Sequence, residues 1–282
     1  MKQGFNVRNR GKAKSMGETV ETACLVLIYL SPLYLLFCIA LKSKDEFARN
    51  NFGWPRKIIW SNLRDAMEQM DYSRALLNSV IIAGCSIALI LLFASMASYA
   101  LGRRKEKIYN NLYMFFLAGM MIPFQLTMLP LYKLINKMRL MGTYWGVVFL
   151  YVASYLPVAI VILTGFIKEI PTELDEAAII DGSSLMYTFW HIIIPLIRAP
   201  LVTVLIFSVV GIWNDLLTPL LFLGSKHQTL IVKLYNFIGA FYVTEWTMMF
   251  AGSIMTMLPL LVVFLISQKY FIEGMVTGAV KG

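Results

Sequence analysis

Six long apolar windows constrain this chain more than any other feature of its sequence. Each window is at least 20 residues long, and five contain no charged residue, namely 22–41, 75–102, 108–132, 140–167 and 246–268. The sixth, 199–225, is interrupted only by Asp215. A helix needs about 20 predominantly apolar residues to cross the hydrocarbon core of a bilayer. The sequence therefore predicts an all-α, polytopic membrane protein with six transmembrane helices.

The composition agrees with a membrane protein and argues against several other classes. Hydrophobic residues make up 59% and charged residues 15%, whereas a soluble domain has roughly 45–50% and about 25%. The net charge of +9 is dispersed among apolar runs, so we expect membrane lipid as a partner and no nucleic acid. Cys24, Cys38 and Cys85 lie inside apolar windows, and His191 and His227 are far apart. Neither a disulfide framework nor a metal site is predicted.

The basic residues predict the orientation of the chain. Five of the first 14 residues are Lys or Arg, with no acid among them, and cytoplasmic flanks of membrane helices are rich in such residues. We therefore expect both termini and the 168–198 loop in the cytoplasm, and the 42–74 loop outside. The chain is thus divided into a cytoplasmic basic tail (1–19), a six-helix transmembrane domain (20–271) and a cytoplasmic C-terminal tail (272–282).

Every window except the second contains an interior proline, and these are Pro32, Pro123 with Pro130, Pro157, Pro219 and Pro259. Each proline removes an intrahelical hydrogen bond that lipid cannot replace, so neighbouring helices or water must satisfy the freed carbonyl. Two interpretations stay open. Proline is common in membrane helices in general, and it also suits the kinked, moving core of a transporter.

The 168–198 loop reads as two short helices rather than as a simple turn. Pro171 suits the first position of a helix, and the acids that follow it favour the positive end of the helix dipole. Gly182 suits the left-handed residue beyond a helix end. Ser183 or Ser184 can cap a second helix, which we expect to stop at Pro195. The pattern predicts an angled helix pair at the membrane face.

The first of these short helices carries small and acidic side chains. Leu174, Ala177 and Ala178 share one face, where the alanines permit close approach of a partner. Five acids surround that face, namely Glu169, Glu173, Asp175, Glu176 and Asp181. We expect such a surface to bind a basic groove on another protein. The alternative is a helix resting on lipid headgroups, although anionic headgroups disfavour its negative charge.

The spacing in this loop resembles that of a known family. Glu176-Ala177-Ala178, Gly182, Ile192 and Ile194-Pro195 reproduce the EAA loop of permease subunits in ATP-binding-cassette importers, with Ile194 where leucine is usual. The chain resembles more narrowly the second permease of carbohydrate importers of the maltose-transporter type. Further stretches that carry this resemblance are Asn78-Ser79, Tyr99 to Arg103, Ile122-Pro123, Leu129 to Tyr132, Trp213-Asn214-Asp215 and the C-terminal segment 268–282.

The resemblance implies a transport subunit of a prokaryotic cytoplasmic membrane that forms half of an alternating-access pathway for a sugar or oligosaccharide. It implies a homologous permease, two cytoplasmic ATPases that bind ATP and magnesium, and an external solute-binding protein. The chain has no Gly-x-x-x-x-Gly-Lys-[Ser/Thr] sequence, so we expect it to bind no cofactor and to be no enzyme. The residues that the resemblance assigns to ATPase coupling are Glu176, Ala177, Ala178, Asp181, Gly182 and Pro195.

The resemblance also assigns a role to the C-terminal tail. In maltose-type permeases the corresponding tail enters the interface of the ATPase dimer, which implies ATPase contacts at Gly274, Gly278 and Gly282. If extended, residues 274–282 span about 30 Å. The alternative is a frayed terminus, which is common at chain ends.

Asp215 is the acid expected inside the membrane. Its burial near the middle of a helix costs roughly 2.5–3.5 kcal/mol unless water or a partner satisfies it, so we expect it to face inward. Trp213 and Asn214 precede it and suit the stacking and hydroxyl contacts of a sugar. Asn78 and Gln125 complete the candidate solute pathway. Simple packing within the bundle stays the alternative for Asp215.

Other classes of membrane protein fit this sequence less well than an importer does. A secondary transporter could bind a proton or sodium at Asp215, but no second intramembrane acid accompanies it. An importer of a non-sugar solute also fits the family pattern. An intramembrane enzyme is disfavoured because no His-Glu-x-x-His, Gly-x-Ser-x-Gly or Gly-x-Gly-Asp sequence occurs, and we assign no catalytic or metal-binding residue.

Overall fold

The computed structural model describes residues 7–239 and 244–279, with side chains for 18–239 and 244–268. Four helices in this part of the chain are long and apolar enough to cross a membrane. They are Glu18–Ala40 within α1 (Val7–Ala40), α4 (Tyr72–Arg103), α7 (Tyr144–Glu169) and Trp246–Gln268 within α14 (Trp246–Ala279). Two bent helix pairs bring the count to as many as six if each is one span. The all-α polytopic fold is confirmed, and the count of six stays a prediction.

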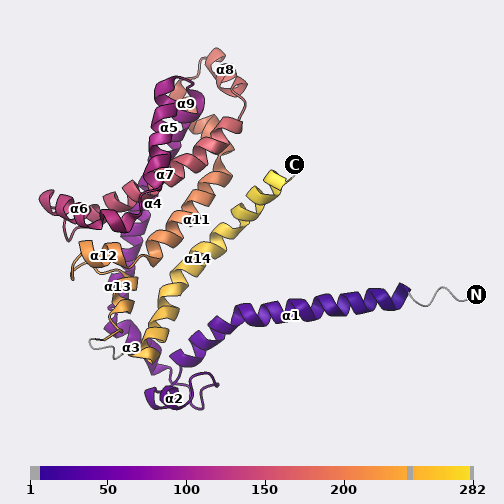
Figure 1. Cartoon of the computed structure of the whole chain (residues 1–282), viewed down its shortest axis with the longest axis vertical. Helices are drawn as coiled ribbons and strands as arrows, with labels where there is room; N and C mark the ends of the chain where they lie inside the picture. Colours follow the sequence, from indigo (N-terminus) through magenta and orange to yellow (C-terminus); the bar gives the residue numbers. More distant parts are fainter. Residues whose placement is uncertain (1–6, 240–243, 280–282) are drawn as a thin grey trace, which may run out of the picture. The chain divides into compact units, whose positions relative to one another are not determined.

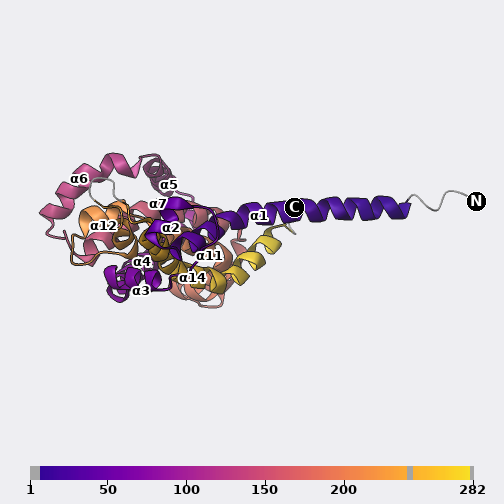
Figure 2. The same cartoon turned by 90° about the horizontal axis from the view of Figure 1, so that it is seen from below.

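The window 108–132 does not form a single straight helix. α5 (Lys107–Met120) and α6 (Phe124–Lys137) meet at 100° across a short break. Pro123 lies in that break, where it lacks a backbone N–H and disfavours helical geometry at the residue before it. Figure 2 shows the chain turning sharply between these two helices.

The window 199–225 is also divided, at a place that the sequence did not reveal. α11 (Arg198–Asn214) ends before Asp215, and the rest of the window forms a separate helix, α12 (Leu217–Phe222). α11 instead pairs with the preceding helical segment, Leu185–Leu196, at an angle of 76°. Asp215 therefore follows a helix end. The sequence had placed it in the middle of a spanning helix, and this expectation was wrong.

The chain forms two compact units. Unit 1 comprises residues 1–69 and 237–255, and contains α1, α2 (Lys44–Arg49), α3 (Ser61–Gln69) and the first turns of α14. Unit 2 comprises residues 70–236 and 256–282. The expected division into a basic tail, a membrane domain and a C-terminal tail follows a different criterion and stays a prediction. Helix α1 already begins at Val7, and α14 continues through Gly274 and Gly278, whereas Gly282 lies outside the described residues.

The segment 42–69 of unit 1 is folded onto the end of α1, although the sequence suggested a loop. Lys42 is fully buried, and its Nζ donates to the carbonyl oxygens of Asn50 at 2.8 Å and Asn51 at 3.2 Å. Asn62 Nδ2 donates to the carbonyl oxygens of Ala40 at 2.8 Å and Lys42 at 2.7 Å. These contacts give the buried Lys42 ammonium its hydrogen-bond acceptors and pair the carbonyls of the buried residues Ala40 and Lys42.

Unit 2 is built around the packing of α4 against α7. The buried face of α4 is rich in small side chains, among them Ala83, Ser86, Ala94, Ser95 and Ser98. Ser98 Oγ donates to the carbonyl oxygen of Ile160 in α7 at 3.1 Å. A Cβ at Gly102 would lie 2.7 Å from Ile167 Cγ2, so only glycine permits this approach. Small residues are typical where membrane helices pack closely.

Short helices lie at the two ends of unit 2. Figure 1 shows α8 (Glu173–Ile180) and α9 (Leu185–Thr188) at one end, and α12 and α13 (Leu230–Tyr235) at the other. α9 continues through a π-helical turn, Phe189–Ile193, into the short α10 (Ile194–Leu196). The 168–198 loop and the segment that follows Asp215 therefore lie at opposite ends of unit 2.

Candidate functional site

The 168–198 loop folds into the expected pair of short helices, joined at Gly182. This residue has φ +81°, its N–H donates to the Ile179 carbonyl at 3.0 Å, and the Ser183 N–H donates to the Ala178 carbonyl at 2.9 Å. These two bonds satisfy the last carbonyls of α8 in the manner of a Schellman motif. Ser184 caps α9 by accepting a hydrogen bond from the Tyr187 N–H at 3.2 Å.

Two proline positions in this loop differ from the prediction. Thr172 is the N-cap of α8, so Pro171 precedes the helix and does not occupy its first position. Pro195 does not end the second helix, which continues to Leu196 and breaks at Ile197. Because Pro195 has no N–H, it cannot form the α-helical bond to the residue four positions earlier, and a π-helical turn precedes it.

The outward surface of α8 combines acidic and apolar side chains. Glu176 and Ala177 are exposed, together with Leu174 and Ile180, and Ile180 is 85% exposed. Ala178 is buried in its own chain, so it does not share the exposed face on which the sequence placed it. Asp181 is exposed at the C-cap. We call Glu173, Leu174, Glu176, Ala177 and Ile180 the outer face of α8.

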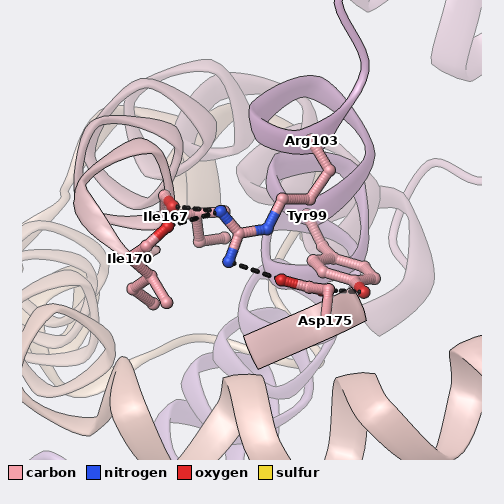
Figure 3. Close-up of polar contacts among 5 residues, drawn as sticks. All are labelled: Tyr99, Arg103, Ile167, Ile170 and Asp175. Atoms are coloured by element: carbon pink, nitrogen blue, oxygen red, sulfur yellow. Dashed lines mark hydrogen bonds and ion pairs between the residues drawn. The ribbon is translucent and has the colours of Figure 1, made fainter. Parts of the chain in front are cut away.

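Asp175 points inward, which corrects its assignment to the exposed acids. Its Oδ2 forms an ion pair with Arg103 Nη2 at 2.8 Å, and its Oδ1 accepts a hydrogen bond from the Tyr99 hydroxyl at 2.5 Å (Figure 3). Arg103 Nη1 also donates to the carbonyl oxygens of Ile167 at 3.1 Å and Ile170 at 2.7 Å. The side chains of Arg103 and Asp175 are only 12% and 13% exposed. We call these five residues the Arg103 cluster.

A cavity of about 420 Å³ lies near the end of α11, and we call it the Asp215 cavity. Its lining residues are Phe124, Tyr151, Ser154, Tyr155, Val158, Phe207, Gly211, Asn214, Asp215 and Thr218. Asp215 accepts hydrogen bonds from the Tyr151 hydroxyl at 3.1 Å and from the Leu217 N–H at 3.0 Å. A Cβ at Gly211 would collide with the Tyr155 hydroxyl, so this glycine permits the close packing of the ring.

The structure separates the five residues of the predicted solute pathway. Asn214 and Asp215 line the cavity. Trp213 instead packs against the core, and its Nε1 donates to the Thr256 carbonyl at 3.1 Å. Asn78 is buried elsewhere, where it donates to the Gln228 carbonyl at 2.9 Å. Gln125 is exposed and lies outside the lining.

Sequence reasoning missed the aromatic residues of the Asp215 cavity. Tyr151 and Tyr155 lie one turn apart on α7 and belong to an apolar window that gives them no distinguishing signal. It also missed the role of Tyr99 and Arg103, although one signal was present. A tyrosine and an arginine four residues apart, at the end of an apolar helix, lie on one face and can share a polar partner.

Comparisons of the sequence find a family and two relatives that match along most of the chain. The family described as binding-protein-dependent transport system inner membrane component matches residues 91–276. The melibiose/raffinose/stachyose import permease protein MelC of Bacillus subtilis (strain 168) is 35% identical over 266 residues, covering 94% of this chain and 96% of that protein. The probable starch degradation products transport system permease protein AmyC of Thermoanaerobacterium thermosulfurigenes is 34% identical over 258 residues, covering 91% and 93%.

One solved structure shows the same fold. A chain from the crystal structure of a bacterial ABC transporter involved in the import of the acidic polysaccharide alginate superimposes with a TM-score of 0.80. The alignment covers 95% of this chain and 100% of that chain, at 19% sequence identity. Similarity at this level of identity supports the fold alone.

Proposed function

Because the chain belongs to the family of inner membrane components of binding-protein-dependent transport systems, we propose that it is the permease subunit of an ATP-driven importer for a sugar or oligosaccharide. The observation that carries the proposal is the exposed outer face of α8, held at one end of a multi-pass helix bundle. The names of MelC and AmyC, which match along almost the whole chain, support a carbohydrate as the solute.

The proposed complex contains a homologous permease, two ATPases and a solute-binding protein. The ATPases would bind ATP and magnesium, because this chain has no phosphate-binding sequence of the P-loop type. The density of basic residues at the N-terminus supports an orientation with both termini and the 168–198 loop in the cytoplasm. In that orientation α8 faces the ATPase, and the solute-binding protein docks on the opposite side.

We assign ATPase coupling to the outer face of α8 and to the turn that ends the helix. Glu176 and Ala177 would contact the ATPase, while Ala178, Asp181, Gly182 and Pro195 maintain the shape of the loop. Glu176→Lys reverses a charge on the contact surface. Gly182→Val places a β-branched residue at φ +81°, a backbone conformation that glycine adopts without steric cost and that β-branched residues disfavour. Both variants are expected to insert into the membrane and to lose coupled uptake.

The test uses the complete complex in liposomes, with ATP hydrolysis and uptake of labelled sugars measured together. Glu169→Lys is the matched control, because Glu169 is exposed in the same loop but lies outside α8. Stimulation of ATP hydrolysis by the binding protein should fall in both α8 variants and persist in the control. Normal stimulation in Glu176→Lys and Gly182→Val would contradict the coupling role, and uptake driven by an ion gradient without ATP would contradict the importer itself.

We assign solute contact to the Asp215 cavity. Hydroxyl groups of a sugar would exchange hydrogen bonds with Asp215 and Asn214, and its apolar ring faces would contact Phe124 or Tyr155. Asp215→Ala should lower uptake more than it lowers assembly, whereas Asp65→Ala in unit 1 should leave uptake unchanged. Normal uptake of every sugar tested by Asp215→Ala would assign the residue to packing alone.

The end of α14 is the second proposed contact with the ATPase. Gly274 and Gly278 lie in the last turns of this helix, and Gly282 follows beyond the described residues. Glycines on a helix permit close approach of another backbone. Removal of 274–282 is expected to preserve assembly but to alter ATP hydrolysis and slow uptake. Wild-type rates of both in the truncated complex would show that this segment is dispensable.

A further inference from the structure

The Arg103 cluster joins three helices that are far apart in the sequence. Tyr99 and Arg103 lie in the last turns of α4, Ile167 and Ile170 lie at the end of α7, and Asp175 lies in α8 (Figure 3). Within the part of the chain whose side chains are described, Asp175 is the only α8 side chain with a hydrogen bond or ion pair. The polar attachment of α8 to the bundle therefore passes through this carboxylate.

The chemistry of the cluster requires an arginine. One guanidinium nitrogen bridges two carbonyl oxygens at the end of α7, while another faces Asp175 in α8. Arginine has five donors in a rigid planar fork, so it can contact both helices at once. A lysine carries a single ammonium on a flexible stem and cannot present donors along two fixed directions.

Apolar packing around the cluster holds the ends of α4 and α7 against the second helix of the 168–198 loop. Ile167 is fully buried with Ile193 and Ile197, and Tyr99 packs against this group. The ring centroids of Tyr99 and Phe189 are 5.5 Å apart. At Gly102, next to Arg103, α4 approaches α7 so closely that a methyl group would collide with Ile167. The ends of α4 and α7 therefore form a packed base for the 168–198 loop.

We propose that Arg103 is a positioning residue for transport, which fixes α8 to the ends of α4 and α7 so that these three helices move as one body. The inference rests on the proposed function, because it requires that α8 contacts the ATPase. Without the cluster, α8 would remain attached by the chain on either side of it and by the buried Ala178, but it would rotate independently of the bundle. ATP hydrolysis would then continue while less of its energy reached the solute pathway.

The decisive measurement is the number of ATP molecules hydrolysed per solute imported by the complete complex in liposomes. Arg103→Gln should raise this ratio at least about tenfold, because it removes one partner of a buried ion pair. Maximal uptake should fall while the solute concentration for half-maximal uptake stays unchanged. A purely structural loss would lower hydrolysis and uptake together and leave the ratio unchanged.

Arg104→Gln is the matched control for this substitution. Arg104 follows Arg103 directly, but its side chain is 54% exposed and lies 3.6 Å from Glu106 in a surface ion pair. Surface pairs of this kind contribute little. The ATP-to-solute ratio of Arg104→Gln should therefore stay within about twofold of the wild type. A rise equal to that of Arg103→Gln would overturn the proposal, because it would assign the effect to loss of any positive charge.

Milder substitutions keep the proposal testable if Arg103→Gln does not assemble. Asp175→Asn keeps the size of the side chain and removes its charge, and Tyr99→Phe removes a single hydroxyl. The ratio is expected to rise in both, and more in Asp175→Asn, because a bond to a charged group contributes more than a neutral one. Arg103→Lys should give an intermediate ratio. Wild-type ratios in Asp175→Asn and Tyr99→Phe, in assembled complexes, would overturn the proposal.

Failure of this inference can be told apart from failure of the proposed function. If Glu176→Lys uncouples the complex and assembled Arg103→Gln shows a wild-type ratio, α8 docks on the ATPase without needing the Arg103 cluster. If Glu176→Lys and Gly182→Val both behave as wild type, the assignment of α8 to coupling fails first. A raised ratio in Arg103→Gln with uncoupling by Glu176→Lys supports both statements.

Discussion

Two buried cations organise the two units in different ways. In unit 1, Lys42 is fully buried and donates to two carbonyl oxygens only eight and nine positions away. In unit 2, Arg103 donates to carbonyl oxygens 64 and 67 positions away and also forms an ion pair with Asp175. The ammonium therefore closes a local loop, whereas the guanidinium joins three separate helices.

The difference follows from the chemistry of the two side chains. A lysine ammonium is a compact charge that suits carbonyl oxygens converging from one short segment. An arginine presents donors in several fixed directions and can therefore connect elements that approach from different sides. Loss of Lys42 should disturb the 42–60 segment alone, whereas loss of Arg103 should affect α4, α7 and α8 together.

The largest expected effect on stability is that of Arg103→Met, which leaves the Asp175 carboxylate buried without a cation. Breaking a buried pair in this way costs about 3–5 kcal/mol. The double variant Arg103→Met/Asp175→Leu should lose less, because no unpaired charge remains. The unfolding temperature of the purified complex in detergent measures the loss of stability in the single and in the double variant. Equal losses in the single and double variants would show that the carboxylate does not depend on Arg103.

Lys42→Met should have the next largest effect, and a more local one. The substitution keeps an apolar stem of similar length but removes the charged donor to the Asn50 and Asn51 carbonyls, and a hydrogen bond to a charged group contributes about 1.5–3 kcal/mol. Hydrogen exchange should increase between residues 43 and 60 and stay unchanged in α4 and α7. Faster exchange throughout unit 2 would contradict the local character of the Lys42 contacts.

Gly102→Ala tests the packed base beneath the Arg103 cluster without touching its polar groups. The added methyl would lie 2.7 Å from Ile167 Cγ2, and forced packing of this kind costs about 1–3 kcal/mol. Gly84→Ala, in the same helix, has no atom within 4 Å of the new methyl and should be neutral or stabilising. If the two variants unfold at the same temperature, the approach of α4 to α7 is not constrained at Gly102.

The smallest expected effect concerns His227, which lies between the end of α12 and the start of α13. Burial and the nearby charges of Lys226 and Arg74 lower the pKa of His227 below its ordinary 6.5. The unfolded chain then binds a proton more readily than the folded one, so stability falls as the pH drops below about 6.5. His227→Gln should reduce this loss between pH 7 and 5, as measured by thermal unfolding. An identical pH profile in the variant would exclude His227 as its source.

The local parts of the candidate site were predictable from sequence because they depend on short-range rules. Gly182 has the left-handed conformation that the pattern required, and Ser184 caps the following helix. The inward direction of Asp175 was not predictable, because four other acids nearby gave the same local signal. Its direction depends on Arg103, which reaches it only when the ends of α4 and α7 meet.

The arrangement of the predicted solute pathway was also only partly predictable from the sequence. Asp215 was identified as an acid in an apolar window, but its position at a helix end depends on the break between α11 and α12. Tyr151 and Tyr155 reach the cavity because α7 packs beside that break. Trp213 was expected there and turns instead to the Thr256 carbonyl. Neighbours in sequence thus face different surroundings, because successive residues on a helix point about 100° apart.

The sequence by itself determined that this protein is helical, enters the membrane several times and carries a capped helix pair between residues 168 and 198. Hydrophobic window length, turn residues and helix caps are local properties, and each acts over about 20 residues or fewer. Only the tertiary structure decided where the bent pairs break, which α8 side chains face outward and which cation meets Asp175. Those outcomes depend on close approach of distant helices, which must satisfy every buried polar group at once.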